Sequence, residues 1–392
     1  MQNYFEQHSD FKGVTNLSFK LSFVETITNV LMNLLGPFSQ LMLTVYSTRT
    51  VLFVSIVICS LGLLLASFST EIWHLYLSQG VLYGIGCSTI FYIALTVVPV
   101  WFVKHRGLAL GIISSGISIG GLVMPLVMEP LNTYFGAAWC YRIMCLICFV
   151  VGTFSCLMFK NKNLADNFTD EKQKNSRNET SDIKSKLTMI MNMFDFSVAK
   201  NWRFLLWVVI DILLEAAYNV PYYFLPSYAT YLGLTPSQGA IILSVGCGMN
   251  ALGRIISGIV ADYIGHVNVA IINSIISGLA CLLIWTYSSD FPILMTFAVV
   301  FGFFGGTFIT FTPTITLLIT GYEKFETGVA VFLVLTVISM FGPNLAGAIE
   351  VLSHAPKAFD SYKYFTGAGY LLGAILLIIF KFSLNRNLFV KI

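Results

Sequence analysis

Residues 238–266 read QGAIILSVGCGMNALGRIISGIVADYIGH. The part from 238 to 261 is mostly apolar or small, and as an α-helix it would be about 36 Å long. That length is enough to cross a hydrocarbon core of roughly 30 Å. Arg254 is the only charged residue in this run, and Asp262 follows at its end. The pattern predicts a membrane-spanning helix that carries one charge at membrane depth.

Runs of this kind recur along almost the whole chain. Of its 392 residues, 56% are hydrophobic and 10% are charged, whereas soluble domains carry about 25% charged residues. Apolar runs long enough to span a bilayer occur at 21–46, 51–69, 73–99, 107–127, 141–159, 202–228, 238–261, 267–286, 291–320, 326–350 and 362–381. We therefore expect an all-α integral membrane protein with about 11 transmembrane helices, five before a polar break and six after it.

The polar break covers residues 160–201 and mixes acidic and basic residues, as flexible loops do. It divides the chain into an N-terminal helical half at 1–159, a loop at 160–201 and a C-terminal helical half at 202–392. Chains built from two such halves are a common transporter plan, with the substrate site near the bilayer midplane. Two halves of six helices would require one more helix before residue 1, so we expect that the first helix of the fold is missing.

The orientation follows from the basic residues, because Lys and Arg are retained on the cytoplasmic side of short loops. If the 160–201 loop is cytoplasmic, the same side holds Arg49, Lys104, Arg106, Lys324, Lys381, Arg386 and Lys391. The opposite side holds only Lys12, Lys20, Arg142, Lys357 and Lys363. We therefore expect a cytoplasmic loop and unmodified sequons at Asn167 and Asn178 within it.

Composition and motifs exclude several classes of function. No cluster of basic residues with interleaved aromatics is present, so we expect no nucleic-acid partner. The 8 cysteines lie in or beside apolar runs without histidines at ligand spacing, so we expect no metal and no cofactor. No nucleophile elbow and no glycine-rich phosphate loop on a strand occurs, which argues against an enzyme.

The end of the 238–266 run carries a more specific pattern. Gly258, Asp262 and Gly265 form Gly-x-x-x-Asp-x-x-Gly, followed by His266 as a single basic residue. This pattern resembles the loop motif of the major facilitator superfamily. The resemblance implies that Asp262 caps and pairs across the cytoplasmic ends of neighbouring helices, and that the three motif residues act in gating.

A narrower resemblance covers nearly the whole chain. Its marks are Gln79-Gly80, Tyr83-Gly84-x-Gly86, Trp101-Phe102-x-Lys104-x-Arg106-Gly107-Leu108-Ala109-x-Gly111, Gly116, Gly120, Gly121, Pro125, Pro221, Phe224-Leu225-Pro226, Tyr228-Ala229 and Gly253-Arg254. Together they are similar to the monocarboxylate transporter family, especially its fungal members. In the animal members an Asp and an Arg on the eighth helix and a Lys in the first helix serve proton-coupled carboxylate transport. Arg254 matches that Arg, but Asn250 stands at the Asp position, so the resemblance does not carry the animal proton-coupling scheme over to this chain.

The residues themselves predict where charge is buried. Asp211, Glu215, Tyr218 and Tyr222 are spaced four, three and four apart, which places them on one helical face. At 1.5 Å per residue, Asp211 and Arg254 both lie about 12 Å above the cytoplasmic helix ends. We hypothesise that Asp211 pairs with Arg254 and that Glu215 carries a proton. A static ion pair with a purely structural role is the alternative.

Other polar residues complete the predicted site. Asn250 and Glu215 come out level by the same count, and Thr307 lies on the 291–320 run with Thr310 and Thr312. We expect Arg254, Asn250, Tyr218, Tyr222 and Thr307 to bind substrate, and Asp211 and Glu215 to couple protons. Threonines in membrane helices also bond back to their own helix, which is the alternative for Thr307.

We therefore predict a secondary active transporter that works by alternating access on a small organic solute, such as a monocarboxylate or another organic anion. Its partners are the solute, protons and the lipid bilayer, and the sequence does not determine the oligomeric state. We expect the plasma membrane rather than a vacuolar or other organelle membrane. The alternative is a truncated, non-transporting relative or an accessory membrane protein.

Overall fold

The computed structural model describes residues 17–102, 104–159, 196–353 and 358–384, and these residues form helices joined by short turns. Ten helices of this described part are long and apolar enough to cross a membrane. Their bounds are Thr48–Ala66, Ile72–Pro99, Arg106–Met128, Pro130–Met158, Trp202–Tyr231, Ser237–Ile264, His266–Trp285, Phe291–Thr320, Phe325–Leu352 and Asp360–Leu384. The expected all-α membrane fold is confirmed.

The described residues pack as two compact units. One comprises described residues within 17–93, 135–159, 196–198 and 329–334, and the other comprises those within 94–134, 199–328 and 335–384. The elements of the first unit are α2 (Leu17–Leu34), α3 (Gly36–Val45), α4 (Thr48–Ala66), α5 (Ile72–Leu75), η1 (Tyr76–Leu82), the start of α6 (Tyr83–Trp101) and the second part of α7 (Arg106–Met158). The expected division at 160–201 stays a prediction, since residues 160–195 lie outside the described part.

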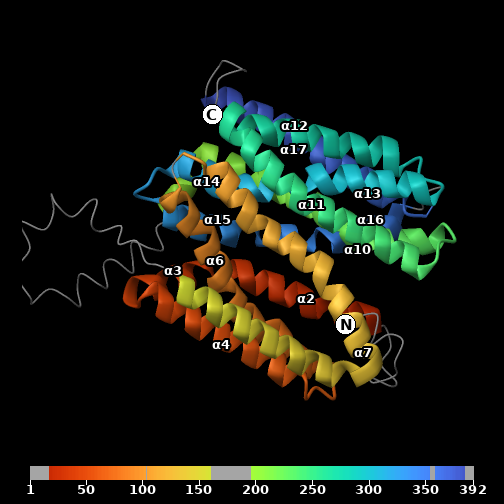
Figure 1. Ribbon diagram of the computed structural model, residues 1–392. Coiled ribbons are helices and arrows are strands. Elements are labelled where there is room, and N and C mark those ends of the chain that lie inside the picture. The colour runs from red at the N-terminus through yellow and green to blue at the C-terminus, as the bar shows by residue number, and fades with distance from the viewer. Residues whose placement is uncertain (1–16, 103, 160–195, 354–357, 385–392) are drawn as a thin grey trace, which may run out of the picture. The chain divides into compact units, whose positions relative to one another are not determined.

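The second unit contains most of the remaining helices (Figure 1). They are α10 (Trp202–Tyr231), α11 (Pro236–Ile264), α12 (His266–Leu279), η3 (Ala280–Trp285), α13 (Phe291–Gly305), α14 (Phe308–Thr320), η4 (Val337–Phe341), α16 (Gly342–Ser353) and α17 (Asp360–Leu384). Two further elements, η2 (Phe196–Lys200) and α15 (Phe325–Thr336), have residues in both units. Here α11 packs on α13, and α17 packs on both α10 and α12. Trp207 of α10 and Phe380 of α17 meet in this core with no exposed surface.

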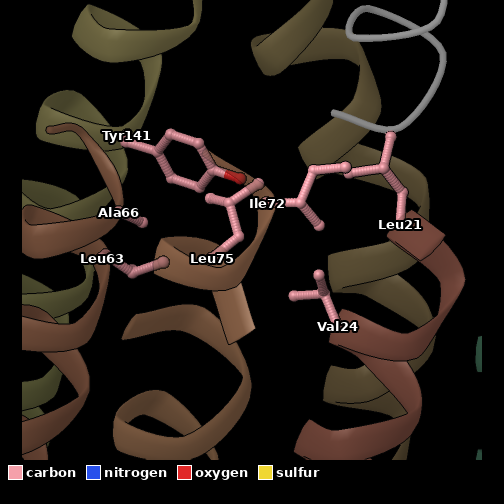
Figure 2. Close-up of a cluster of buried hydrophobic side chains, with 7 residues drawn as sticks. All are labelled: Leu21, Val24, Leu63, Ala66, Ile72, Leu75 and Tyr141. Carbon is pink, nitrogen blue, oxygen red and sulfur yellow. The ribbon is translucent and has the colours of Figure 1, made fainter. Parts of the chain in front are cut away.

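The first unit has an apolar core between α2, α4, α5 and the second part of α7. Figure 2 shows Leu63, Ala66 and Tyr141 beside Leu75, with Ile72 next to Leu21 and Val24. All seven side chains are at most 9% exposed. The Tyr141 hydroxyl donates to Gln79 Oε1 at 2.7 Å, so its one polar group is satisfied within the unit.

The span expected at 21–46 is divided into two helices. α2 ends at Leu34 and α3 begins at Gly36, with Pro37 in the first turn of α3. A proline lacks the N–H that would continue the helical hydrogen bonds, so it fits a first turn and bends a continuous helix. This segment is not among the ten long spans of the described part.

The region between the expected spans 107–127 and 141–159 also differs from expectation. It is helical, and α7 runs from Arg106 to Met158 with one non-helical residue, Gly136, at φ 79° and ψ 168°. The chain passes from one compact unit to the other between residues 134 and 135, next to this residue. A turn made by a single glycine needs no run of polar or charged residues, so the sequence pattern does not show where it lies. The two helices therefore extend further toward each other than the apolar runs predict.

Candidate functional site

Arg254 lies inside the second unit and is 1% exposed. Its Nε donates to Asn250 Oδ1 at 2.8 Å, one helical turn earlier on α11. Its Nη1 donates to the main-chain oxygen of Ser114 on α7 at 2.9 Å, and its Nη2 donates to the Tyr218 hydroxyl on α10 at 3.4 Å. Three helices therefore hold one guanidinium, and all three acceptors are neutral.

Asn250 connects the same helices and is also 1% exposed. Its Nδ2 donates to the main-chain oxygen of Gly302 on α13 at 2.9 Å. Its Oδ1 accepts from the Ser118 hydroxyl at 2.6 Å and from the Tyr218 hydroxyl at 3.4 Å, besides Arg254 Nε. Arg254, Asn250 and Tyr218 thus form a closed set of hydrogen bonds, and their role in binding substrate stays a prediction.

Asp211 does not pair with Arg254. Asp211 is 3% exposed, and its Oδ1 accepts from the Thr312 hydroxyl on α14 at 3.4 Å. The hypothesis failed because it compared only the heights of the two backbones. Helical side chains lean toward the N-terminus of their own helix, and the consecutive helices α10 and α11 run in opposite directions. The carboxylate and the guanidinium therefore lean away from each other.

Glu215 lies one turn after Asp211 and contacts a different element. Its Oε2 is 2.8 Å from the Ser339 hydroxyl in η4, and that hydroxyl is also 2.6 Å from the main-chain oxygen of Thr336. A serine hydroxyl has one hydrogen and can donate to only one of these oxygens at a time. A proton on Glu215 would let both contacts be hydrogen bonds.

Tyr218 and Tyr222 lie side by side on α10, with ring centroids 4.9 Å apart. Phe301 of α13 packs against both, at 6.5 Å from Tyr218 and 6.2 Å from Tyr222. The buried Tyr222 hydroxyl has no hydrogen-bond partner within the described part of the chain. A cavity of about 10 Å³ adjoins Tyr222, which is room for about one water molecule.

Thr307 does not join this cluster. Its hydroxyl accepts from Asn273 Nδ2 on α12 at 2.8 Å and donates to the main-chain oxygen of Phe304 at 2.9 Å. Asn273 also donates to the Ser257 hydroxyl on α11 at 3.0 Å. Thr307 is 1% exposed and both of its hydrogen-bond roles are filled within the unit.

The motif residues lie at the junction of α7, α11 and α12. Asp262 accepts from the main-chain nitrogens of Gly107 at 2.8 Å and Leu108 at 3.0 Å, which are free donors of the first turn of α7. A Cβ on Gly258 would lie 2.2 Å from the main-chain oxygen of Gly107. Gly265, at φ 98°, ends α11 and starts α12. The residues are placed as the motif implies, and their gating role stays a prediction.

Sequence reasoning did not single out Ser114 and Ser118, which contact Arg254 and Asn250. A signal for them was present in the spacing of small residues, because Gly107, Gly111, Ser114 and Ser118 are four, three and four apart. Such a stripe lies on one helical face and allows close helix packing in membranes. Within the described residues, no group of three or more His, Cys, Asp or Glu side chains could hold a metal ion.

Comparisons with known proteins agree with this fold. A family model described as Major Facilitator Superfamily matches residues 14–347 and residues 216–388. The agnestins efflux protein AgnL12 of Paecilomyces divaricatus is 26% identical over 350 residues, which is 88% of this chain and 74% of that protein. An MFS-type transporter of Gibberella moniliformis is 26% identical, over 90% of this chain and 80% of the relative.

Solved structures share the fold as well. The crystal structure of the transporter FucP in the outward conformation superposes with a TM-score of 0.68 at 12% identity. That likeness covers 97% of this chain and 95% of FucP. At this identity the likeness concerns the fold alone.

Proposed function

The chain belongs to the major facilitator superfamily, and from this premise we propose that it moves small organic anions, monocarboxylates among them, by alternating access. Its relatives are membrane transporters and not enzymes. That it is an integral membrane transporter is therefore given by the family and the ten apolar helices of the described part. The proposal concerns the solute and its coupling.

The observation that carries the proposal is Arg254, buried to 1% with three neutral hydrogen-bond acceptors. An arginine at membrane depth costs at least about 2.5 to 3.5 kcal/mol, so membrane arginines face a partner or a cavity. A carboxylate is the partner that a guanidinium fork binds with two parallel charge-assisted hydrogen bonds. None of the three hydrogen bonds that Arg254 makes within the described part of the chain ends on a carboxylate, which leaves that role to the solute.

Proton coupling is the second part of the proposal. Asp211 and Glu215 lie one turn apart on α10, within the membrane span Trp202–Tyr231. Within the described part of the chain, Asp211 contacts the hydroxyl of Thr312 and Glu215 that of Ser339, and neither carboxylate bonds to Arg254. We propose that Glu215 binds and releases the proton that accompanies the solute, with Asp211 as the neighbouring charge. The proposed mechanism is therefore symport of the solute with a proton.

The membrane and the direction of transport complete the proposal. We place the protein in the plasma membrane, as expected from the sequence. AgnL12 is named an efflux protein, so the assay should allow export as well as import. A non-transporting relative is not favoured, because the matched relatives are named as transporters.

The test is solute exchange in proteoliposomes that contain the purified chain and are preloaded with labelled lactate or benzoate. We expect exchange with the parent chain, loss of about tenfold or more in Arg254→Gln, and partial activity in Arg254→Lys, which keeps the charge but not the fork. Arg203→Gln is the matched control, because Arg203, at the start of α10, donates to the main-chain oxygen of Ser383 at the end of α17, away from the cluster. Full activity in Arg254→Gln would contradict the proposal.

A further inference from the structure

The first part of α7 and the C-terminal part of α11 meet along a continuous line within the second unit. On α7 the contacting residues are spaced four, three, four and three apart: Gly107, Gly111, Ser114, Ser118 and Gly121. On α11 they meet, in the reverse order of sequence, Asp262, Gly258, Arg254, Asn250 and Cys247. We call these ten residues the α7–α11 seam.

The two ends of the seam are contacts between small residues. A Cβ on Gly107 would lie 2.2 Å from the main-chain oxygen of Gly258, and one on Gly111 would lie 2.6 Å from that of Arg254. At the other end, a Cβ on Gly121 would lie 3.3 Å from Cys247 Sγ. The backbones of the two helices therefore approach closely at the Gly107 end of the seam, whereas at the Gly121 end the contact is with the side chain of Cys247.

The middle of the seam is polar and contains the proposed binding site. Arg254 Nη1 donates to the main-chain oxygen of Ser114 at 2.9 Å, and Ser118 donates to Asn250 Oδ1 at 2.6 Å. Arg254 is the only basic residue of the seam, and α7 occupies one of its two terminal nitrogens. The groups proposed to bind the solute are thus the groups that hold α7.

We propose that a solute carboxylate opens the seam, because it takes the Arg254 guanidinium from the Ser114 carbonyl. This inference rests on the proposed function. A bidentate carboxylate binds two neighbouring nitrogens of the guanidinium. On the Nη1–Nη2 edge it shares Nη1 with the Ser114 carbonyl oxygen, and on the Nε–Nη2 edge it shares Nε with Asn250, so the anion competes with one of these bonds. Charge-assisted hydrogen bonds are roughly twice as strong as neutral ones, so the exchange favours the carboxylate.

The consequence is a coupling between binding and movement. A ligand shifts a conformational equilibrium only by its different affinity for the two states. Here the difference has a source, since Arg254 binds α7 in one state and the carboxylate in the other. Ser118 and the Ser114 carbonyl act as positioning groups that keep the guanidinium occupied until an anion arrives.

The seam contains its own reporter for a cross-linking experiment. In a Gly121→Cys variant the new Cβ would lie 3.9 Å from Cys247 Cβ, within the roughly 3.5 to 4.5 Å range of native disulfides. Mild oxidation with copper phenanthroline should link position 121 to the native Cys247 only while the seam is closed. Gly120→Cys is the matched control, because no heavy atom lies within 4 Å of a Cβ at that position.

The measurement is the initial rate of this cross-link, quantified by mass spectrometry of the linked peptides, in the full chain in proteoliposomes. Lactate or benzoate should slow the cross-link by about fivefold or more, the lower end of ordinary coupling between sites. Added to Gly121→Cys, Arg254→Gln should abolish this dependence on the anion. Ser118→Ala, which leaves Arg254 in place, should slow the cross-link without any anion. Gly120→Cys should not link under any condition.

Exchange of labelled solute in the same proteoliposomes separates the two proposals. Oxidised Gly121→Cys should lose exchange and a reducing agent should restore it. Exchange that survives complete cross-linking overturns the inference and leaves the proposed function intact, as does exchange of an anion that never changes the cross-link rate. If neither anion is exchanged nor changes the cross-link rate, both proposals fail for these solutes.

Discussion

Arg254 illustrates how side-chain direction decides a buried charge network. Counting residues placed its backbone level with Asp211, yet its guanidinium bonds to Asn250, which is four residues nearer the N-terminus of α11. The side chain follows the tilt of its own helix, and the Asp211 side chain follows the opposite tilt of α10. One helical turn after Asp211, the Glu215 carboxylate contacts the Ser339 hydroxyl and not the Arg254 guanidinium.

The proton-coupling proposal makes a prediction for Glu215. Glutamine keeps the shape and the hydrogen-bonding oxygen of Glu215 but cannot bind or release a proton. In Glu215→Gln we therefore expect that an imposed inward proton gradient no longer drives net solute accumulation, while exchange at equal pH continues. The measurement is solute accumulation in proteoliposomes with and without the gradient.

Ser339→Ala serves as the control for this substitution. It removes the hydroxyl at 2.8 Å from Glu215 but leaves the carboxyl group able to carry a proton. It should therefore still respond to the proton gradient. A gradient response that is unchanged in Glu215→Gln would show that the coupling proton travels elsewhere.

At the scale of helices, small residues explain much of what the sequence did and did not predict. Long apolar runs predicted the helices themselves, and Trp202–Tyr231 and Phe291–Thr320 follow the expected 202–228 and 291–320 closely. The breaks were harder to predict because one residue makes each of them. Pro37 divides the first expected span, and Gly136 alone turns α7 where a loop was expected.

Gly136 offers a test of that turn. At φ 79° and ψ 168° an alanine would take a backbone conformation that is essentially restricted to glycine, which costs about 1 to 3 kcal/mol. We expect Gly136→Ala to lower the melting temperature of the detergent-solubilised chain. Gly120→Ala should act in the opposite direction, because Gly120 lies in helical backbone of the same α7 with no atom within 4 Å of an added Cβ.

Gly136→Ala and Gly120→Ala make the same chemical change, and they differ in the backbone conformation of the glycine that is replaced. An alanine in a helix interior is about 0.5 to 1 kcal/mol better than a glycine, so Gly120→Ala should raise the melting temperature slightly. Equal shifts for both variants would mean that the break at Gly136 is not required for the folded state. Scanning fluorimetry with a thiol-reactive or tryptophan signal is sufficient for this comparison.

For the whole molecule, composition and charge predicted the class of protein, whereas the contacts between side chains depend on how the helices pack. The ten long apolar helices of the described part agree with an integral membrane transporter. The motif residues and the Arg254, Asn250 and Tyr218 set could be found from sequence, because glycine spacing and a charge in an apolar run are visible there. The spacing of small residues marks the helical face that holds Ser114 and Ser118, but their contacts and that of Ser339 could not be found, since each depends on which helices meet. The expected helix before residue 1 stays a prediction.

The orientation of the whole chain follows from the sum of its basic residues and can be tested at two positions. Lys104 precedes the span Arg106–Met128 and is expected in the cytoplasm, whereas Ser289, between the spans ending at Trp285 and beginning at Phe291, is expected outside. Both side chains are exposed.

With a membrane-impermeant maleimide, Ser289→Cys should react in intact cells and Lys104→Cys only after permeabilisation. The unsubstituted chain, whose cysteines lie in or beside apolar runs, measures the background. The reverse labelling pattern would invert the predicted topology, and labelling of neither position in intact cells would place the protein in an internal membrane.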